Sequence, residues 1–232
     1  MKFDIRQLDV TASTNDEAKN AAEGGAPEGT VVWALEQQAG RGRQGRVWSS
    51  PRGNLYCSIL LRPEIPVREW GKYSFVVGLA LYETVAFYLN KKIELKWPND
   101  VLVEGRKISG ILLESGENWL VAGMGLNVLH VPENPIYSVT SLAMETPHMP
   151  LLETVLTKLL DRLDHWYGCL NQTGFAPIRH AWLERARKGN LRVRQPQGDI
   201  EGQFADLDPD GNLCLILKDG TQKTFSTGDV FF

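Results

Sequence analysis

Cysteine is scarce in this sequence. Its 232 residues include three cysteines, Cys57, Cys169 and Cys214, which are odd in number, far apart and in no C-x-x-C arrangement. That usage argues against a disulfide framework and fits the reducing cytoplasm. A chain of this length also buries enough surface to fold without a disulfide or a structural metal.

Long apolar runs and an excess of one charge sign are missing too. The first ten residues, MKFDIRQLDV, contain no apolar core of a secretory signal. The longest uncharged apolar run, residues 73–82, is about half of what a bilayer span requires. The 25 Lys and Arg residues face 28 Asp and Glu, a net charge of −3. We therefore expect a cytoplasmic protein that neither enters a membrane nor coats nucleic acid.

What is present is an ordinary globular composition, 43% hydrophobic, arranged in alternating helix and strand patterns. The pattern predicts helices over residues 13–23, 69–89, 151–170 and 177–188. It predicts strands over residues 31–35, 54–62, 91–97, 101–103, 107–114 and 119–124. Thr14 to Glu17 reads as a capping box that opens the first helix, and Gly189 as the residue that closes the last one.

After Gly189 the pattern changes to short strands separated by closely spaced turns, without helix. That texture predicts a small β-barrel at the C-terminus. We expect a catalytic domain over residues 1–188 and the barrel over residues 189–232.

The most unusual segment is residues 39–53, AGRGRQGRVWSSPRG, here called the arginine loop. It holds four arginines, four glycines and no acid. Glycine lets backbone N–H groups approach an oxyanion, and arginine can bind phosphate or carboxylate through two N–H groups. Solubility alone would explain the arginines but not the alternating glycines. The loop therefore predicts a local anion site.

Two familiar nucleotide-binding motifs nearly match the arginine loop. Residues 40–45 satisfy G-x-G-x-x-G, but residues 47–53 cannot form the helix that a dinucleotide fingerprint opens. Residues 40–47 approach G-x-x-x-x-G-K-[ST], but Arg46 replaces the lysine and Val47 the hydroxyl. Both interpretations fail.

A second cluster, residues 96–100 (KWPND), precedes a predicted hairpin that Lys96 and Lys107 flank. By itself a Pro-Asn-Asp segment is as readily a turn as a site. Together with the arginine loop it supplies guanidinium groups, lysine and a carboxylate. That combination suits phosphoryl or adenylyl transfer to an anionic substrate.

Five motifs follow one another along the chain: STN (13–15), QQAGRGRQGRVW (37–48), KWPND (96–100), RKISGI (106–111) and GMGLN (123–127). In this order they resemble the motifs of biotin protein ligases, specifically biotin–[acetyl-CoA-carboxylase] ligases. The resemblance implies an α+β fold: a mixed, mostly antiparallel sheet with helices, similar to class II synthetases, followed by an SH3-like barrel. Because twelve residues precede Ser13, we expect no helix-turn-helix of the repressor type and no DNA binding.

The resemblance also implies a reaction with ATP and biotin as substrates. The biotin carboxylate attacks the α-phosphorus of ATP, giving biotinoyl-5′-AMP and pyrophosphate. A lysine of a biotin carboxyl carrier protein then displaces AMP. Mg²⁺ is expected to accompany ATP, and the arginine loop to close over the water-sensitive adenylate.

The resemblance further assigns site residues. Catalytic positions are Lys107, Arg43 and Asp100. Biotin-binding positions are Ser13, Thr14, Asn15, Gln37, Gly40, Arg41, Lys107 and Gly110. Adenylate-binding positions are Arg43, Arg46, Trp48, Asn99 and Asn127. Asp100 either orients Lys107 or accepts a proton from the incoming amine. No metal site is expected, because the four histidines lack triad or metal-ligand spacing.

Two alternatives stay open. A lipoate–protein ligase would share the fold and the adenylate chemistry. A non-catalytic module would use the arginine loop and the barrel to hold an anionic partner. For the ligase interpretation the partner is a carrier domain of a biotin-dependent carboxylase, and the protein could form a homodimer.

Overall fold

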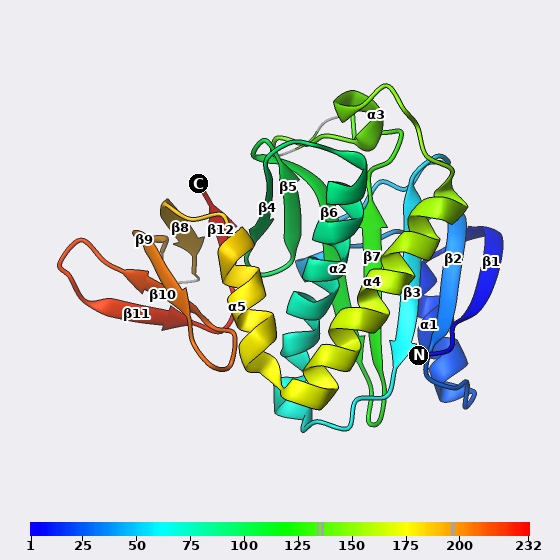
Figure 1. Ribbon diagram of the computed structural model, residues 1–232, viewed down its shortest axis with the longest axis horizontal. Coiled ribbons are helices and arrows are strands. Elements are labelled where there is room, and N and C mark those ends of the chain that lie inside the picture. The colour runs from blue at the N-terminus through cyan, green and yellow to red at the C-terminus, as the bar shows by residue number, and fades with distance from the viewer. Residues whose placement is uncertain (134, 136, 196–197) are drawn as a thin grey trace.

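The computed structural model describes residues 1–133, 135, 137–195 and 198–232 (Figure 1). Within them a seven-stranded sheet has the order β1-β2-β3-β7-β6-β5-β4. In chain order its strands are β1 (Asp4–Thr11), β2 (Thr30–Gln37), β3 (Leu55–Leu61), β4 (Ile93–Lys96), β5 (Asp100–Val103), β6 (Arg106–Ser115) and β7 (Leu120–Leu126). β1 pairs with β2 in parallel, and the other neighbours pair antiparallel. The predicted mixed, mostly antiparallel sheet is confirmed.

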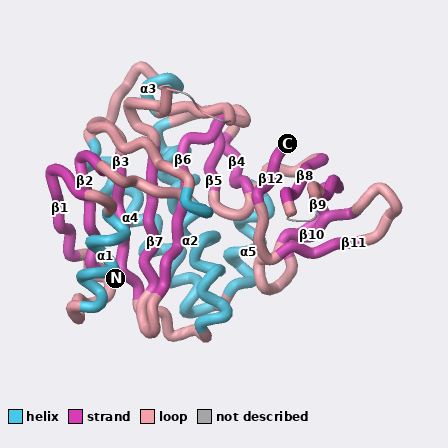
Figure 2. Tube along the Cα trace, turned by 180° about the vertical axis from the view of Figure 1, so that it is seen from behind, coloured by secondary structure: helices cyan, strands magenta, loops and turns pink. Residues whose placement is uncertain are grey.

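Helices cover both faces of this sheet. Their bounds are α1 (Thr14–Glu23), α2 (Tyr73–Tyr88), α3 (Leu142–Glu145), α4 (Leu152–Thr173) and α5 (Phe175–Arg185). α2 and α4 lie on the side that faces the viewer in Figure 1, whereas Figure 2 shows α1 on the other side. Successive strand residues point to opposite faces, so Val31 packs in the core with α2 and α4 while Val32 packs against Ala18 of α1.

α2 is apolar nearly all round because it is buried between the sheet and the other helices. It begins at Tyr73, later than predicted, since residues 67–72 form a 3₁₀ segment. α4 shows the predicted one-sided pattern, with Leu156, Leu159 and Leu163 buried.

A smaller antiparallel sheet follows, at the left of Figure 1, in the order β11-β10-β9-β8-β12. Its strands are β8 (Asn190–Arg194), β9 (Ile200–Leu207), β10 (Leu213–Ile216), β11 (Gln222–Phe225) and β12 (Asp229–Phe231). It is joined to the main sheet by the Trp97 indole, which donates to the Gly211 carbonyl at 3.1 Å. A small C-terminal β domain is therefore present.

Two predicted helix-end signals are wrong. α5 ends at Arg185 rather than before Gly189, because Ala186 is extended and pairs with Leu95 at the edge of β4. The capping box does not form, because Glu17 accepts a hydrogen bond from Thr11 instead. The strand β1 and the short helix α3 were not predicted.

Candidate functional site

A cavity of about 350 Å³ lies between the main sheet, the arginine loop and the C-terminal domain. Most of the residues predicted from sequence line it: Ser13, Thr14, Asn15, Gln37, Arg41, Arg43, Arg46, Trp48, Asn99, Asp100, Lys107 and Gly110. Gly123, Met124 and Gly125 of the GMGLN motif line it as well, so the fold brings all five sequence motifs to one place.

One corner of the cavity is a fixed set of neutral polar groups, at the start of α1 and the end of β2. Gln37 Oε1 accepts from the Thr14 N–H at 2.8 Å and lies 3.1 Å from its Oγ1, while Gln37 Nε2 donates to Ser50 at 2.9 Å. Ser58 Oγ lies 2.7 Å from Thr14 Oγ1 and 2.6 Å from Asn15 Oδ1. These bonds hold Gln37, Thr14 and Asn15 in fixed positions, ready for an uncharged polar ligand group.

Arg41 fastens the arginine loop to the main sheet. Its guanidinium donates to both Asp16 oxygens at 2.7 Å and to Glu114 at 2.9 Å. This two-pronged hydrogen bond lowers the pKa of Asp16 to about 2. The Arg41 side chain is thus occupied by protein carboxylates.

Arg43 and Arg46 reach the C-terminal domain. Arg46 forms an ion pair with Asp229 of β12. Among the described residues Arg43 makes only long hydrogen bonds, 3.3 Å to Asn99 Oδ1 and 3.4 Å to both the Gly228 carbonyl and Thr227 Oγ1. Burial lowers the pKa of Arg43. A partly desolvated guanidinium with weak protein partners is well suited to an anionic ligand.

Lys107 is held beside a carboxylate and two aromatic rings. Its Nζ lies 2.6 Å from Asp100 Oδ1, and 5.3 Å and 5.2 Å from the ring centroids of Trp48 and Tyr137. Asp100 also faces Lys96 at 3.6 Å. Burial lowers the pKa of Lys96, against the opposing charge of Asp100. Of the two roles expected for Asp100, orienting Lys107 is the one that this contact fits.

Trp48 lies on a slot formed by two glycines. Gly110 of β6 and Gly125 of β7 are direct cross-strand partners. A Cβ at Gly110 would lie 3.1 Å from the indole, and one at Gly125 would lie 2.5 Å from it. Only glycine at both positions leaves room for a flat ring on this part of the sheet.

Comparison with known proteins agrees with this geometry. The model of the biotin/lipoate A/B protein ligase family matches residues 7–129, and that of the biotin protein ligase C-terminal domain matches residues 190–232. The biotin–[acetyl-CoA-carboxylase] ligase of Paracoccus denitrificans is 37% identical, over 96% of this chain and 98% of the relative. The enzyme of that name from Mycobacterium tuberculosis is 38% identical, over 97% and 88%.

The chain belongs to the biotin protein ligase family. Membership makes it an enzyme. The solved structure of the Aquifex aeolicus biotin protein ligase in complex with biotin and ATP superposes with a TM-score of 0.86, at 27% identity over 98% of this chain and 97% of that one. The likeness extends through both sheets.

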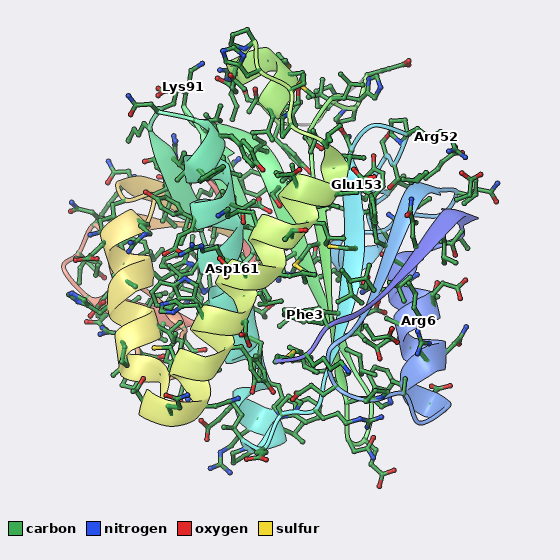
Figure 3. All side chains as sticks on the ribbon, turned by 45° about the vertical axis from the view of Figure 1, so that its right-hand side comes forward. Phe3, Arg6, Arg52, Lys91, Glu153 and Asp161 are labelled. Carbon is green, nitrogen blue, oxygen red and sulfur yellow. The ribbon has the colours of Figure 1, made fainter. Side chains whose placement is uncertain are left out.

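Two residues predicted for the site of this ligase do not line its cavity. Asn127 is buried and donates its side-chain N–H to the Thr140 carbonyl at 3.0 Å. Gly40 lies behind Gln37, where a Cβ would come within 2.5 Å of Ser50. Both support the walls of the site. Arg52, at the far end of the arginine loop, lies at the outer edge and pairs with Asp9 at 2.7 Å (Figure 3).

Sequence reasoning missed several residues that line the ligase cavity. Tyr137 comes from the segment before α3, and Arg194, Asp229 and Phe231 come from the C-terminal domain. None belongs to a motif. Their positions in the chain gave no signal, because the docking of the C-terminal domain brings three of them here.

In the described part of the chain, no group of three or more His, Cys, Asp or Glu side chains is placed to hold a metal ion. Among the helices of that part, none combines the length and the apolar character that crossing a bilayer demands.

Proposed function

We propose that this ligase activates biotin with ATP to give biotinoyl-5′-AMP and then transfers biotin to a lysine of a biotin carboxyl carrier domain. One observation carries the proposal. A single cavity combines the fixed neutral corner at Gln37 and Thr14 with the two cations Lys107 and Arg43. The names of the relatives, and the biotin and ATP in the Aquifex aeolicus complex, support this function.

The first step brings two anions together, the biotin carboxylate and the α-phosphate. Fixed cations must offset their repulsion and the charge that develops on the phosphate. Lys107 and Arg43 fill this role in the proposal. Asp100 keeps the Lys107 ammonium aimed into the cavity through the 2.6 Å ion pair. The carboxylate oxygen attacks phosphorus, and pyrophosphate leaves with the bonding electrons of the broken P–O bond.

The neutral corner suits the ureido ring of biotin, which both donates and accepts hydrogen bonds. Ser13, Thr14, Asn15 and Gln37 supply both kinds of group. Trp48 and the slot of Gly110 and Gly125 offer a flat apolar surface for the adenine ring, and Asn99 and Arg46 line the same cavity. Mg²⁺ would arrive bound to the phosphates of ATP.

In the second step the carrier lysine attacks the carbonyl carbon of the adenylate, and AMP leaves with the electrons of the C–O bond. The amine must lose a proton, and we assign its acceptance to Asp100, the cavity carboxylate that orients Lys107 in the first step. The arginine loop shields the adenylate from water until then. We further propose that residues 1–188 carry the chemistry, that residues 189–232 complete the cavity, and that the reaction takes place in the cytoplasm, where the free cysteines stay reduced.

The test measures biotin-dependent pyrophosphate release from ATP. Lys107→Ala should lower the rate by about 10²–10³, the usual cost of losing one preorganised charge. Arg52→Ala is the matched control, because Arg52 belongs to the same loop but pairs with Asp9 at the outer edge. A wild-type rate for Lys107→Ala would refute the assignment.

Two companion assays distinguish a biotin ligase from a lipoate ligase and from a non-catalytic module. Lipoate in place of biotin should give no pyrophosphate and should not compete, whereas a lipoate ligase would favour it. A non-catalytic module would release no pyrophosphate with either acid. Transfer is tested by mass spectrometry of a purified carrier domain, which should gain one biotin at a single lysine.

A further inference from the structure

Glu145, at the end of α3, is a buried carboxylate outside the cavity. Its side chain is 0% exposed. Oε1 accepts from Arg106 at 2.6 Å and from the Thr140 hydroxyl, and Oε2 pairs with Lys91 at 2.7 Å. Burial would raise the pKa of Glu145, but these hydrogen bonds and the two cations hold it below its ordinary value.

The partners on Oε1 flank Lys107 on both sides. Arg106 precedes Lys107 in β6. Thr140 belongs to the segment alongside, where its N–H donates to the Lys107 carbonyl at 2.9 Å, and the Lys107 N–H donates to the Ser138 carbonyl at 2.9 Å. Lys107 needs this support because β6 carries an irregularity at this point: opposite Val101 and Leu102 of β5 lie Ser109 and Lys107. Such bulges aim side chains, but they loosen the ladder.

We propose that Glu145 is a positioning residue for Lys107. By binding both Arg106 and Thr140, it holds β6 against residues 137–140 and so fixes the position of the Lys107 ammonium. This proposal rests on the function proposed for Lys107. Folding stability alone explains a buried carboxylate here less well, since apolar residues often replace a buried ion pair without loss of stability. Tyr137, three residues before Thr140, also places its ring 5.2 Å from Lys107 Nζ.

The two oxygens of Glu145 allow a matched comparison. Thr140→Val removes the hydroxyl on Oε1, on the Lys107 side, at almost constant volume. Lys91→Met removes the cation on Oε2. Lys91 lies in the loop after α2, at the α3 end of the molecule (Figure 3), and among the described residues its side-chain hydrogen bond goes to Glu145 and not to the strand of Lys107. Each variant removes one partner of the same carboxylate, so a general loss of stability should affect both.

We expect Thr140→Val and Glu145→Gln to lower kcat for biotin-dependent pyrophosphate release about tenfold or more, because a shift of about 1 Å can cost 10²-fold. The KM for biotin should change less than kcat, since the neutral corner that faces the ureido ring is untouched. Lys91→Met should keep kcat within about twofold while thermal unfolding shifts as it does in Thr140→Val.

The double variant Thr140→Val/Lys107→Ala decides whether the effect passes through Lys107. It should be no slower than Lys107→Ala alone, because coupled residues do not add. An equal further loss in that background, or unchanged kcat in both Thr140→Val and Glu145→Gln, would overturn the positioning role while leaving the proposed function intact. Wild-type turnover by Lys107→Ala would instead remove the proposed function, and with it the role of Glu145.

Discussion

Gly125→Ala tests the slot under Trp48 with a single methyl group. The new Cβ would stand 2.5 Å from the indole ring, whereas carbon atoms pack at about 3.5–4.0 Å. Trp48 therefore has to move by about 1 Å, or the two strands have to separate. Overpacking of this kind costs about 1–3 kcal/mol of folding stability. Because Trp48 belongs to a loop, we expect the ring to leave the slot and the stability loss to stay at the lower end.

The assay distinguishes an effect on ATP binding from an effect on biotin binding. With Trp48 displaced, the KM for ATP should rise and the adenylate should escape faster, by about tenfold for each 1.4 kcal/mol of lost contact. Biotin binding, measured calorimetrically without ATP, should be unchanged. Gly71→Ala is the control, because among the described residues no atom beyond the adjoining chain stands within 4 Å of the Cβ that it would add.

A double-mutant cycle that combines Gly125→Ala with Trp48→Ala can refute this reasoning. Once the indole is gone, adding the methyl group at position 125 should cost nothing further. Equal losses with and without the indole would show that the glycine serves the strand pairing rather than Trp48, and the slot would lose its proposed role.

Two other predictions follow from perturbed groups. The pKa of Asp16 is lowered to about 2 by Arg41, so its contribution to stability is present above the unfolded value of about 3.9 and is lost as pH falls towards 2. In Asp16→Asn the free energy of unfolding should therefore depend less on pH between those two values. An unchanged pH dependence in that range would contradict the pairing. Burial raises the pKa of Cys57 to about 12, so a thiol reagent at neutral pH should modify Cys169 in the native protein and Cys57 only after unfolding; labelling of native Cys57 would show that β3 opens.

Much of this protein could be predicted from local sequence. The apolar spacing of α4 predicts both the helix and its buried face, because a helix repeats every 3.6 residues whatever surrounds it. The arginine loop and the KWPND segment indicate phosphate chemistry because of their residue types alone. Signals at element ends were less reliable. Ala186 pairs with the β4 edge, and that contact overrides the preference of Gly189 for ending a helix.

Tertiary structure decided the rest. β1 was missed because it is an edge strand that is exposed along most of its length. Buried and exposed residues do not alternate along it, so the sequence carries no strand pattern there. The pairing of Arg46 with Asp229 joins residues 183 positions apart, and the slot exists only because the register of β6 and β7 sets Gly110 opposite Gly125. Strand register and domain docking depend on how many surfaces fit together at once. The motifs thus determined which chemical groups this ligase has, and the fold determined which of them meet.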